Sequence, residues 1–186
     1  MRAEDADAVI VATGARPGPL PFPAEGIEVL DQWQAMAHPP HDAEVVLVDT
    51  GGRYEGAALA ETLAPHNHLR WVAPTPWVGF EVDPASAAPL RRRLAAHETE
   101  LIPQTLVVGA SAGAVTTVHV VTGRVATIAP VDTLVLAGNK RADRALADAL
   151  AGDGPAVQVV GDAVAPRDVA AAILEGARAA HRLDDR

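Results

Sequence analysis

Residues 45–64 read VVLVDTGGRYEGAALAETLA, and no other stretch restricts the fold of this chain as strongly. The first letters are apolar and β-branched, which is typical of a strand buried on both faces of a parallel sheet. Two glycines interrupt the run, and alanine and leucine then recur at the spacing of one buried helical face. The pattern predicts a strand over 44–49, a glycine turn, and a helix over 54–63. The run LRWVA at 69–73 predicts the next strand of a right-handed βαβ unit.

The rest of the chain alternates between strand and helix patterns, which places it in the α/β class. PGPLPFPAEG at 17–26 has too many prolines for a helix or a central strand, so we expect an ordered loop or crossover. The Val- and Thr-rich stretch 100–136 predicts a small antiparallel meander, with Thr122-Gly123 at a hairpin corner and a return to the parallel sheet at 133–137. The remaining predicted elements are strands at 7–13 and 156–160 and helices within 27–36, 85–97, 142–150 and 168–181, although Pro89 argues against a helix in the first half of 85–97.

The composition limits both partners and chemistry. The formal net charge of -9 disfavours nucleic acid, because surfaces that bind phosphate backbones are built from clustered Lys and Arg. No apolar run approaches the ~20 residues that cross a bilayer, and the acidic start MRAEDADA is unlike a signal peptide. We therefore expect a cytoplasmic protein without a membrane partner. The chain has no cysteine, so disulfides, thiolate nucleophiles and iron-sulfur ligation by its own thiolates are excluded.

The glycine turn matches the pyrophosphate-binding pattern G-x-G-x-x-G only in part. Gly51 and Gly56 occupy its first and third glycine positions, but Arg53 stands at the second, where a side chain obstructs the pyrophosphate. The acidic residue that usually binds a ribose hydroxyl is missing from APT at 73–75. Two interpretations stay open: Arg53 pairs with a bound phosphate, or the turn only packs its helix against the sheet.

Patterns for catalysis or metal binding are incomplete elsewhere. Ser111 in GASAG resembles a nucleophile elbow, but the β-rich sequence after it predicts a strand where the elbow needs a helix. The histidine pairs at 38/41 and 66/68 lack a third spaced ligand. Tyr54 has no lysine four residues later, so the Tyr-x-x-x-Lys pair of a free-standing dehydrogenase is absent. We therefore assign no catalytic residue and no metal ligand.

Four segments in a fixed order resemble one enzyme family, the NADH:flavin oxidoreductases with an old-yellow-enzyme barrel. They are VIVATGARP (9–17), VVLVDTGGRYEGAALAETLA (45–64), DTLVLAGNKRADRAL (132–146) and GDAVAPRDVAAAILEGARAA (161–180). The family includes 2,4-dienoyl-CoA reductase and trimethylamine and dimethylamine dehydrogenases, and the similarity is to its C-terminal flavin- and nucleotide-binding part. It covers nearly the whole chain.

The resemblance implies a Rossmann-like FAD/NAD(P)-binding fold, in which an incomplete flavin domain carries an inserted nucleotide-binding domain. Residues 1–39 and 138–186 would form the partial FAD- or ADP-binding domain, and residues 40–137 the inserted NAD(P)-binding-like domain. The family's first GxGxxG and its catalytic barrel with FMN and iron-sulfur cysteines have no counterpart in these residues. We therefore expect either a flavoprotein partner subunit that carries the barrel and the first GxGxxG, or a homo-oligomer.

The resemblance also implies which residues bind a cofactor. In the flavin domain, the Thr-Gly pair would line the adenine-dinucleotide site, and the Gly-Asp pair would meet the flavin ribityl chain or the pyrophosphate. In the inserted domain, three glycines would form the pyridine-nucleotide turn. The residues carried over are Thr13, Gly14, Gly161, Asp162, Gly51, Gly52 and Gly56.

The expected cofactor is FAD or ADP. Some family members have a degenerate second turn that binds no pyridine nucleotide, which agrees with Arg53 and the missing acid, so NAD(P) is disfavoured. The chain is expected to be a dinucleotide-binding or electron-transfer module of a flavin-dependent oxidoreductase, related to amine dehydrogenases, demethylases or enoate reductases. The alternative is a non-catalytic subunit that completes and stabilises a partner flavoprotein.

Overall fold

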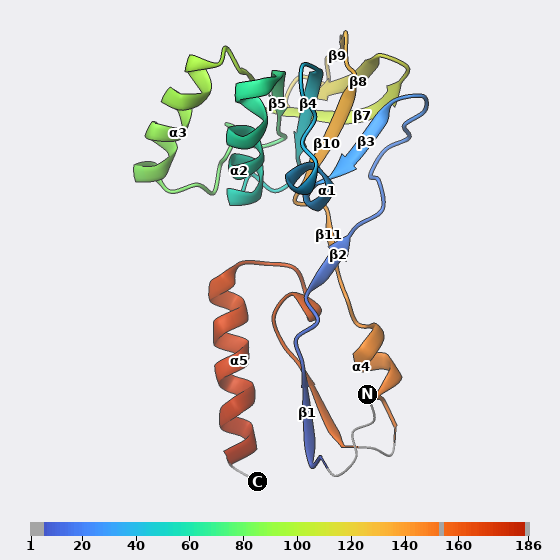
Figure 1. Ribbon diagram of the computed structural model, residues 1–186, viewed down its shortest axis with the longest axis vertical. Coiled ribbons are helices and arrows are strands. Elements are labelled where there is room, and N and C mark those ends of the chain that lie inside the picture. Colours follow the sequence, from blue (N-terminus) through green and yellow to red (C-terminus); the bar gives the residue numbers. More distant parts are fainter. Residues whose placement is uncertain (1–5, 153–154, 185–186) are drawn as a thin grey trace. The chain divides into compact units, whose positions relative to one another are not determined.

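The computed structural model describes residues 6–152 and 155–184, which form two compact units (Figure 1). One unit combines Met1–Gly18 with Lys140–Arg186, and we call it the split unit. The other is the continuous stretch Pro19–Asn139, which we call the inserted unit. Each has its own sheet structure.

The inserted unit is built on a five-stranded parallel sheet with the order β3-β10-β4-β5-β6. The central strand β4 lies next to β10 on one side and β5 on the other. The chain runs from β4 outward through β5 and β6, and later returns to β10 on the opposite side, so the strand order reverses between β4 and β10. The strands are β3 (Glu28–Asp31), β4 (Glu44–Asp49), β5 (His68–Val72), β6 (Glu100–Ile102) and β10 (Thr133–Ala137).

Helices cover one face of this sheet. Val45 and Leu47 of β4 point to that face and share one apolar core with Leu59, Leu63 and other residues of the helices. The alternation along β4 follows from the strand pleat, which sends neighbouring side chains to opposite faces. The helical elements of this unit are α1 (Gln32–Ala37), α2 (Tyr54–Leu63), η1 (Ala64–His66) and α3 (Pro84–Ala96).

An antiparallel sheet covers the opposite face. Val46 and Val48 of β4 pack there against Val107, Val115 and Phe22, the last from the proline-rich loop. The predicted meander is confirmed as β7 (Thr105–Ser111), β8 (Ala114–His119) and β9 (Val125–Ile128), paired in that order. Gly123 has a φ of +70° in the turn between β8 and β9, as the hairpin prediction required.

The split unit contains two small sheets. Strand β1 (Ala8–Val11) pairs in parallel with β12 (Ala156–Val159), so the first and last predicted strands lie side by side. Strand β2 (Ala15–Pro17) pairs antiparallel with β11 (Lys140–Ala142). The helical elements of this unit are α4 (Ala145–Ala149), η2 (Gly161–Ala163) and α5 (Val169–Asp184).

The structure differs from the sequence prediction in three respects. Residues 19–39 and 138–139, assigned above to the flavin domain, belong to the inserted unit, where β3 pairs with β10. Strand β6 joins the parallel sheet through β5 instead of the meander. Helix α3 continues through Pro89, and the missing N–H of this proline leaves one hydrogen bond of the helix unmade.

Candidate functional site

The glycine turn after β4 is organised around a buried carboxylate. Asp49 is only 1% exposed, and its Oδ1 accepts hydrogen bonds from the backbone N–H groups of Gly51 at 3.1 Å and Gly52 at 2.8 Å. Its Oδ2 accepts a third hydrogen bond from Trp71 Nε1 at 3.2 Å. The side chain therefore takes up two of the turn's backbone donors, which a phosphate-binding turn would direct at its ligand.

Gly56 is a glycine because of this carboxylate. A Cβ at Gly56 would lie 2.3 Å from Asp49 Oδ2, so the first turns of α2 can lie against the end of β4 only without a side chain there. Burial raises the pKa of the Asp49 carboxyl above its ordinary value, and the hydrogen bonds from Gly52 and Gly51 act in the opposite direction. Asp49 acts as an internal anion of the turn.

The segment that follows β5 packs over the turn. Gly52 has a φ of +66°, and a Cβ on it would lie 3.1 Å from Phe80 Cβ. The N–H of Glu81 donates to the carbonyl of Gly52 at 2.8 Å. Arg53 Nε pairs with Glu81 Oε2 at 2.9 Å, so the guanidinium that could have met a phosphate is neutralised by the chain itself.

A second contact fixes the same segment. Tyr54 Oη donates a hydrogen bond of 2.5 Å to Asp83 Oδ2, while Asp83 Oδ1 caps α3 by accepting from Ala85 N at 2.9 Å and Ser86 N at 3.1 Å. Hydrogen bonds from Ser86 and from Tyr54 lower the pKa of Asp83 to about 2. The consecutive residues Arg53 and Tyr54 thus bind the carboxylates of Glu81 and Asp83, which both lie in the segment between β5 and α3.

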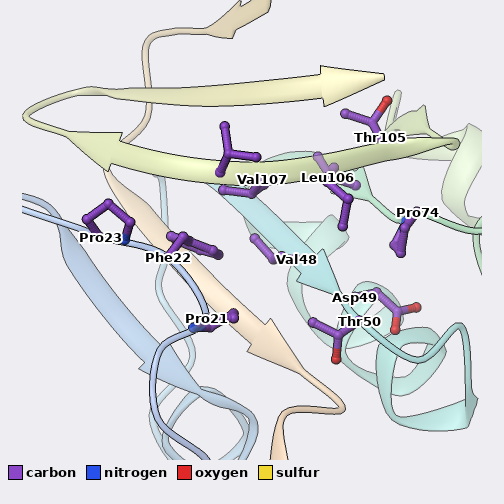
Figure 2. A pocket seen from close by; sticks show the side chains of 12 residues that line it. Pro21, Phe22, Pro23, Val48, Asp49, Thr50, Pro74, Thr105, Leu106 and Val107 are labelled. Carbon is purple, nitrogen blue, oxygen red and sulfur yellow. The ribbon is translucent and has the colours of Figure 1, made fainter. Parts of the chain in front are cut away.

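A pocket of about 390 Å³ opens beside the carboxyl end of β4, between the parallel sheet, β7 and the proline-rich loop (Figure 2). Figure 2 shows Phe22, Val48 and Val107 around it and Thr50 at the end of β4. Thr50 Oγ1 already donates to the carbonyl of Ala137 at 3.0 Å. Because the hydroxyl is engaged and Asp49 is satisfied by the turn, the pocket mainly offers apolar surface.

The split unit brings together the two sequence-predicted pairs for the adenine-dinucleotide site. β1 and β12 run in parallel with Val11 opposite Val159, so the Thr13–Gly14 pair and the Gly161–Asp162 pair both follow strand ends at one edge of that sheet. This is the edge at which ligands bind in open α/β sheets.

Each of these pairs has a defined local geometry. Thr13 Oγ1 donates to the carbonyl of Asp143 at 2.6 Å, and the carbonyl of Gly14 accepts from Asp143 N at 3.0 Å. Gly14 has a φ of +79°, and nothing lies within 4 Å of where its Cβ would be. The space beside this turn is therefore open to a ligand.

The Gly161–Asp162 pair is fixed by contacts with side chains of α5 and β11 and with the backbone of Arg167. Gly161 has a φ of +64°, and its N–H donates to Glu175 Oε2 at 2.7 Å. Asp162 Oδ1 accepts from Arg167 N at 3.0 Å, and its Oδ2 lies 3.6 Å from Lys140 Nζ. The hydrogen bond from Arg167 lowers the pKa of Glu175, so this carboxylate stays ionised.

Sequence reasoning missed the acidic residues that organise both sites. The letters DTGG do contain a usable signal for Asp49, because an aspartate that precedes two glycines commonly accepts hydrogen bonds from the next backbone N–H groups. Asp143 and Glu175 have no such signal, since their partners lie on other elements. Asp143 also pairs with Arg16 Nε at 2.7 Å, and this bond lowers its pKa.

Groups for metal binding or membrane insertion are not found in the described part of the chain. Among residues 6–152 and 155–184, no three His, Cys, Asp or Glu side chains are grouped to hold a metal ion. No helix in the same ranges has the length and apolarity needed to span a bilayer. Ser111 lies at the end of β7 and is followed by β8, so the arrangement is a hairpin and has no helix after the serine.

Comparison with known proteins identifies the family of this chain and solved structures that share its fold. The family model described as pyridine nucleotide-disulphide oxidoreductase matches residues 2–162. No curated protein matches the chain.

Several solved structures share the fold. Histamine dehydrogenase from Rhizobium sp. 4-9 aligns with a TM-score of 0.85 and 24% identity, over 96% of this chain and 31% of its own. 6-Hydroxypseudooxynicotine amine oxidase from Pseudomonas geniculata N1 aligns with a TM-score of 0.76 and 19% identity, over 94% of this chain and 28% of its own. Thioredoxin reductase from Lactococcus lactis aligns with a TM-score of 0.67 and 18% identity, over 93% of this chain and 63% of its own. The chain therefore spans less than two thirds of each, and the predicted Rossmann-like α/β fold is confirmed.

Proposed function

The chain belongs to the pyridine nucleotide-disulphide oxidoreductase family, and from that premise we propose that it is the dinucleotide-binding, electron-transfer module of a flavin-dependent oxidoreductase. The split unit holds FAD or ADP in this proposal. The observation that carries it is the meeting of Thr13–Gly14 and Gly161–Asp162 at one carboxyl edge of the β1–β12 sheet. A bound flavin would supply two-electron redox chemistry, and the residues of this chain would position it.

The residues at that edge fit a dinucleotide. The backbone at Gly14 is open and has a positive φ, which allows close approach of a pyrophosphate or sugar. Asp162 retains 29% side-chain exposure, so its carboxylate can also accept a hydroxyl hydrogen bond. Lys140 beside it offsets the negative charge that would otherwise repel phosphate.

The inserted unit has the form of an NAD(P)-binding domain, and we propose that it binds no pyridine nucleotide. Asp49 accepts from the N–H groups of Gly51 and Gly52, and Arg53 is already paired with Glu81. A pyrophosphate would have to displace both and would meet the buried Asp49 charge. This proposal resolves the two interpretations of Arg53 in favour of a packing turn.

We further propose that the whole protein is related to the old-yellow-enzyme-like amine dehydrogenases, demethylases or enoate reductases. The sequence motifs support this, and the histamine dehydrogenase match has a TM-score of 0.85. No catalytic residue is assigned to this chain. A cytoplasmic location follows from the same proposal.

The split unit has exposed apolar surface that a partner could cover. Helix α5 leaves Val169, Ile173 and Leu174 at 74%, 67% and 50% exposure, and among the described residues β1 and β12 pair only with each other. Parallel sheets are normally covered on both faces. We propose a flavoprotein partner that carries the barrel and the first GxGxxG and covers these surfaces, with a homo-oligomer as the second arrangement.

Titration of the full chain with FAD, ADP and NADPH tests the cofactor assignment. Calorimetry is expected to show saturable binding of FAD or ADP and none of NADPH. A Gly14→Val variant should weaken that binding at least ten-fold, because the side chain fills the open space. Gly113→Val is the matched control, since Gly113 also has a positive φ, of +77°, and nothing within 4 Å of its Cβ position, but lies in the β7–β8 turn.

The same titration separates the alternative function. If neither FAD nor ADP binds, alone or in the presence of the partner, the chain is a non-catalytic subunit that completes a partner flavoprotein. The closed turn around Asp49 is the observation that favours that alternative. Equal losses in Gly14→Val and Gly113→Val would also contradict the site assignment.

A further inference from the structure

An open groove of about 710 Å³ lies on the inserted unit, and it is lined by Phe80, which packs against Gly52, but not by residues 51–56 of the glycine turn. It is bounded by the loop after β5, by one side of α3 and by the edge strand β6. Val78, Val82 and Ala87 are buried and form its apolar floor. No residue of the proposed cofactor site contributes to it.

Two aromatic side chains stand exposed at this groove. Trp77 is 47% and Phe80 is 42% exposed, and their ring centroids are 4.7 Å apart. Aromatic residues make up only 3% of the chain, so it is unusual that two of them lie in contact and half exposed at one groove. Exposed Trp beside an apolar floor is typical of contact surfaces, where such a residue anchors a partner.

The one charged side chain among the described residues that line the groove is a cation, although the chain as a whole is acidic. Arg91 lines the groove, is exposed, and makes no hydrogen bond or ion pair within residues 6–152 and 155–184. Helix α3 carries no Asp or Glu between Pro84 and Ala96. Three carboxylates that neighbour the lining residues in sequence are already engaged: Glu81 by Arg53, Asp83 by Tyr54 and the start of α3, and Glu100 of β6 by Arg70.

The groove also runs along a free strand edge. Strand β6 is the last in the order of its sheet, and among the described residues only β5 pairs with it. Leu101 of β6 and Pro103 just after it form one wall of the groove. An unpaired edge of this kind presents backbone N–H and C=O groups to an added strand.

We infer that this groove binds an extended, acidic segment of a partner protein. Its backbone pairs with the outer edge of β6, an apolar side chain inserts beside Trp77 and Phe80, and a carboxylate meets Arg91. The strand edge favours a peptide over a small anion, because only a peptide backbone can form the hydrogen bonds that extend a sheet. This inference does not depend on cofactor binding, and its test can fail independently of the proposed function.

The test uses the full chain and the N-acetylated, C-amidated pentapeptide DVFVD. In an extended conformation its phenylalanine and both aspartates lie on one face, as the groove requires. Calorimetry is expected to show saturable binding that weakens as salt is raised. The peptide KVFVK, with the same apolar residues and opposite charge, should bind at least ten-fold more weakly.

Three variants locate the contact. Arg91→Glu and Trp77→Ala should each weaken DVFVD binding at least ten-fold, in line with the loss expected for anchor residues. Arg92→Glu is the matched control, because Arg92 is the adjacent exposed arginine of α3 but does not line the groove, and its binding should stay within two-fold of the parent. Circular dichroism spectra and melting temperatures should show that all three variants are folded.

Four outcomes would overturn the inference. They are the absence of DVFVD binding, equal binding of KVFVK, an equal loss in Arg92→Glu, and competition by 2′,5′-ADP at micromolar concentration. The last would indicate that the groove takes a small phosphate-bearing anion and that the strand edge plays no part.

Discussion

Replacing Gly56 with alanine tests the idea that Asp49 is built into the turn as its anion. Alanine normally favours a helix interior over glycine by about 1 kcal/mol. Here the added Cβ would lie 2.3 Å from Asp49 Oδ2, and the carboxylate cannot move freely because three hydrogen bonds hold it. The steric cost therefore opposes the gain in helix propensity.

The magnitude follows from these two terms. Overpacking at a closely packed site costs about 1–3 kcal/mol, and a displaced carboxylate loses hydrogen bonds worth about 1.5–3 kcal/mol each when the acceptor is charged. If the overpacking cost is added to the loss of a single bond, the net change after the helix gain is about 1.5–5 kcal/mol of destabilisation. With a urea m value of about 2 kcal/mol/M, the midpoint would fall by about 0.8–2.5 M.

Tryptophan fluorescence during urea unfolding is the appropriate assay. Trp33, Trp71 and Trp77 all lie in the inserted unit, so their emission reports on that unit alone. Ala58→Gly, at an exposed position of the same helix, is the control for helix propensity and should cost about 1 kcal/mol.

A double-mutant cycle with Asp49→Ala completes the test. Once the carboxylate is removed, Gly56→Ala should lose its penalty, which gives a coupling free energy of at least about 1 kcal/mol between the two positions. A Gly56→Ala variant that is as stable as the parent or more stable, or a coupling near zero, would refute the internal-anion account.

Three further predictions concern other parts of the molecule. Asp83 has a pKa of about 2 in the folded chain against an ordinary value of 3.8, so its ionised form adds stability above that ordinary value, and this contribution is lost as the pH falls toward 2. Asp83→Asn, which keeps an N-cap oxygen, should therefore reduce the fall in melting temperature between pH 4 and pH 2; an unchanged slope would contradict the assignment. Gly161→Ala should destabilise the split unit by about 1 kcal/mol or more, because its φ is +64° and the new Cβ would lie 3.4 Å from Ala172 Cβ; hydrogen exchange of α5 amides would measure it. Ile173→Lys on the exposed side of α5 should abolish co-purification with the flavoprotein partner, whereas Arg182→Lys should not.

Much of the inserted unit could be predicted from the sequence because its signals are local. The strand 44–49 and the helix 54–63 have the bounds that the apolar periodicity indicates. Thr133–Ala137 was predicted for the same reason, since a short apolar run between polar residues is typical of a buried parallel strand.

What the sequence did not predict depends on distant partners. Strand β3 is only four residues long and exists because it pairs with β10, about a hundred residues later in the chain. That pairing moves the boundary of the inserted unit from residue 39 to residue 18. The role of Asp49 was missed because the pyrophosphate-binding pattern is defined by its glycines and by a ribose-binding acid, and it contains no acid that fills the turn from within.

The antiparallel pairing of β2 with β11 has a consequence for how such a chain can be rebuilt. Pro17 lies directly opposite Lys140, so the points where the polypeptide leaves the split unit and re-enters it are neighbours across one strand pair. Opposed strand residues can be joined by a two-residue turn. Residues 18–139 could therefore be exchanged for an Asn-Gly hairpin, and the same junction could accept an unrelated folded module whose ends lie about 5 Å apart.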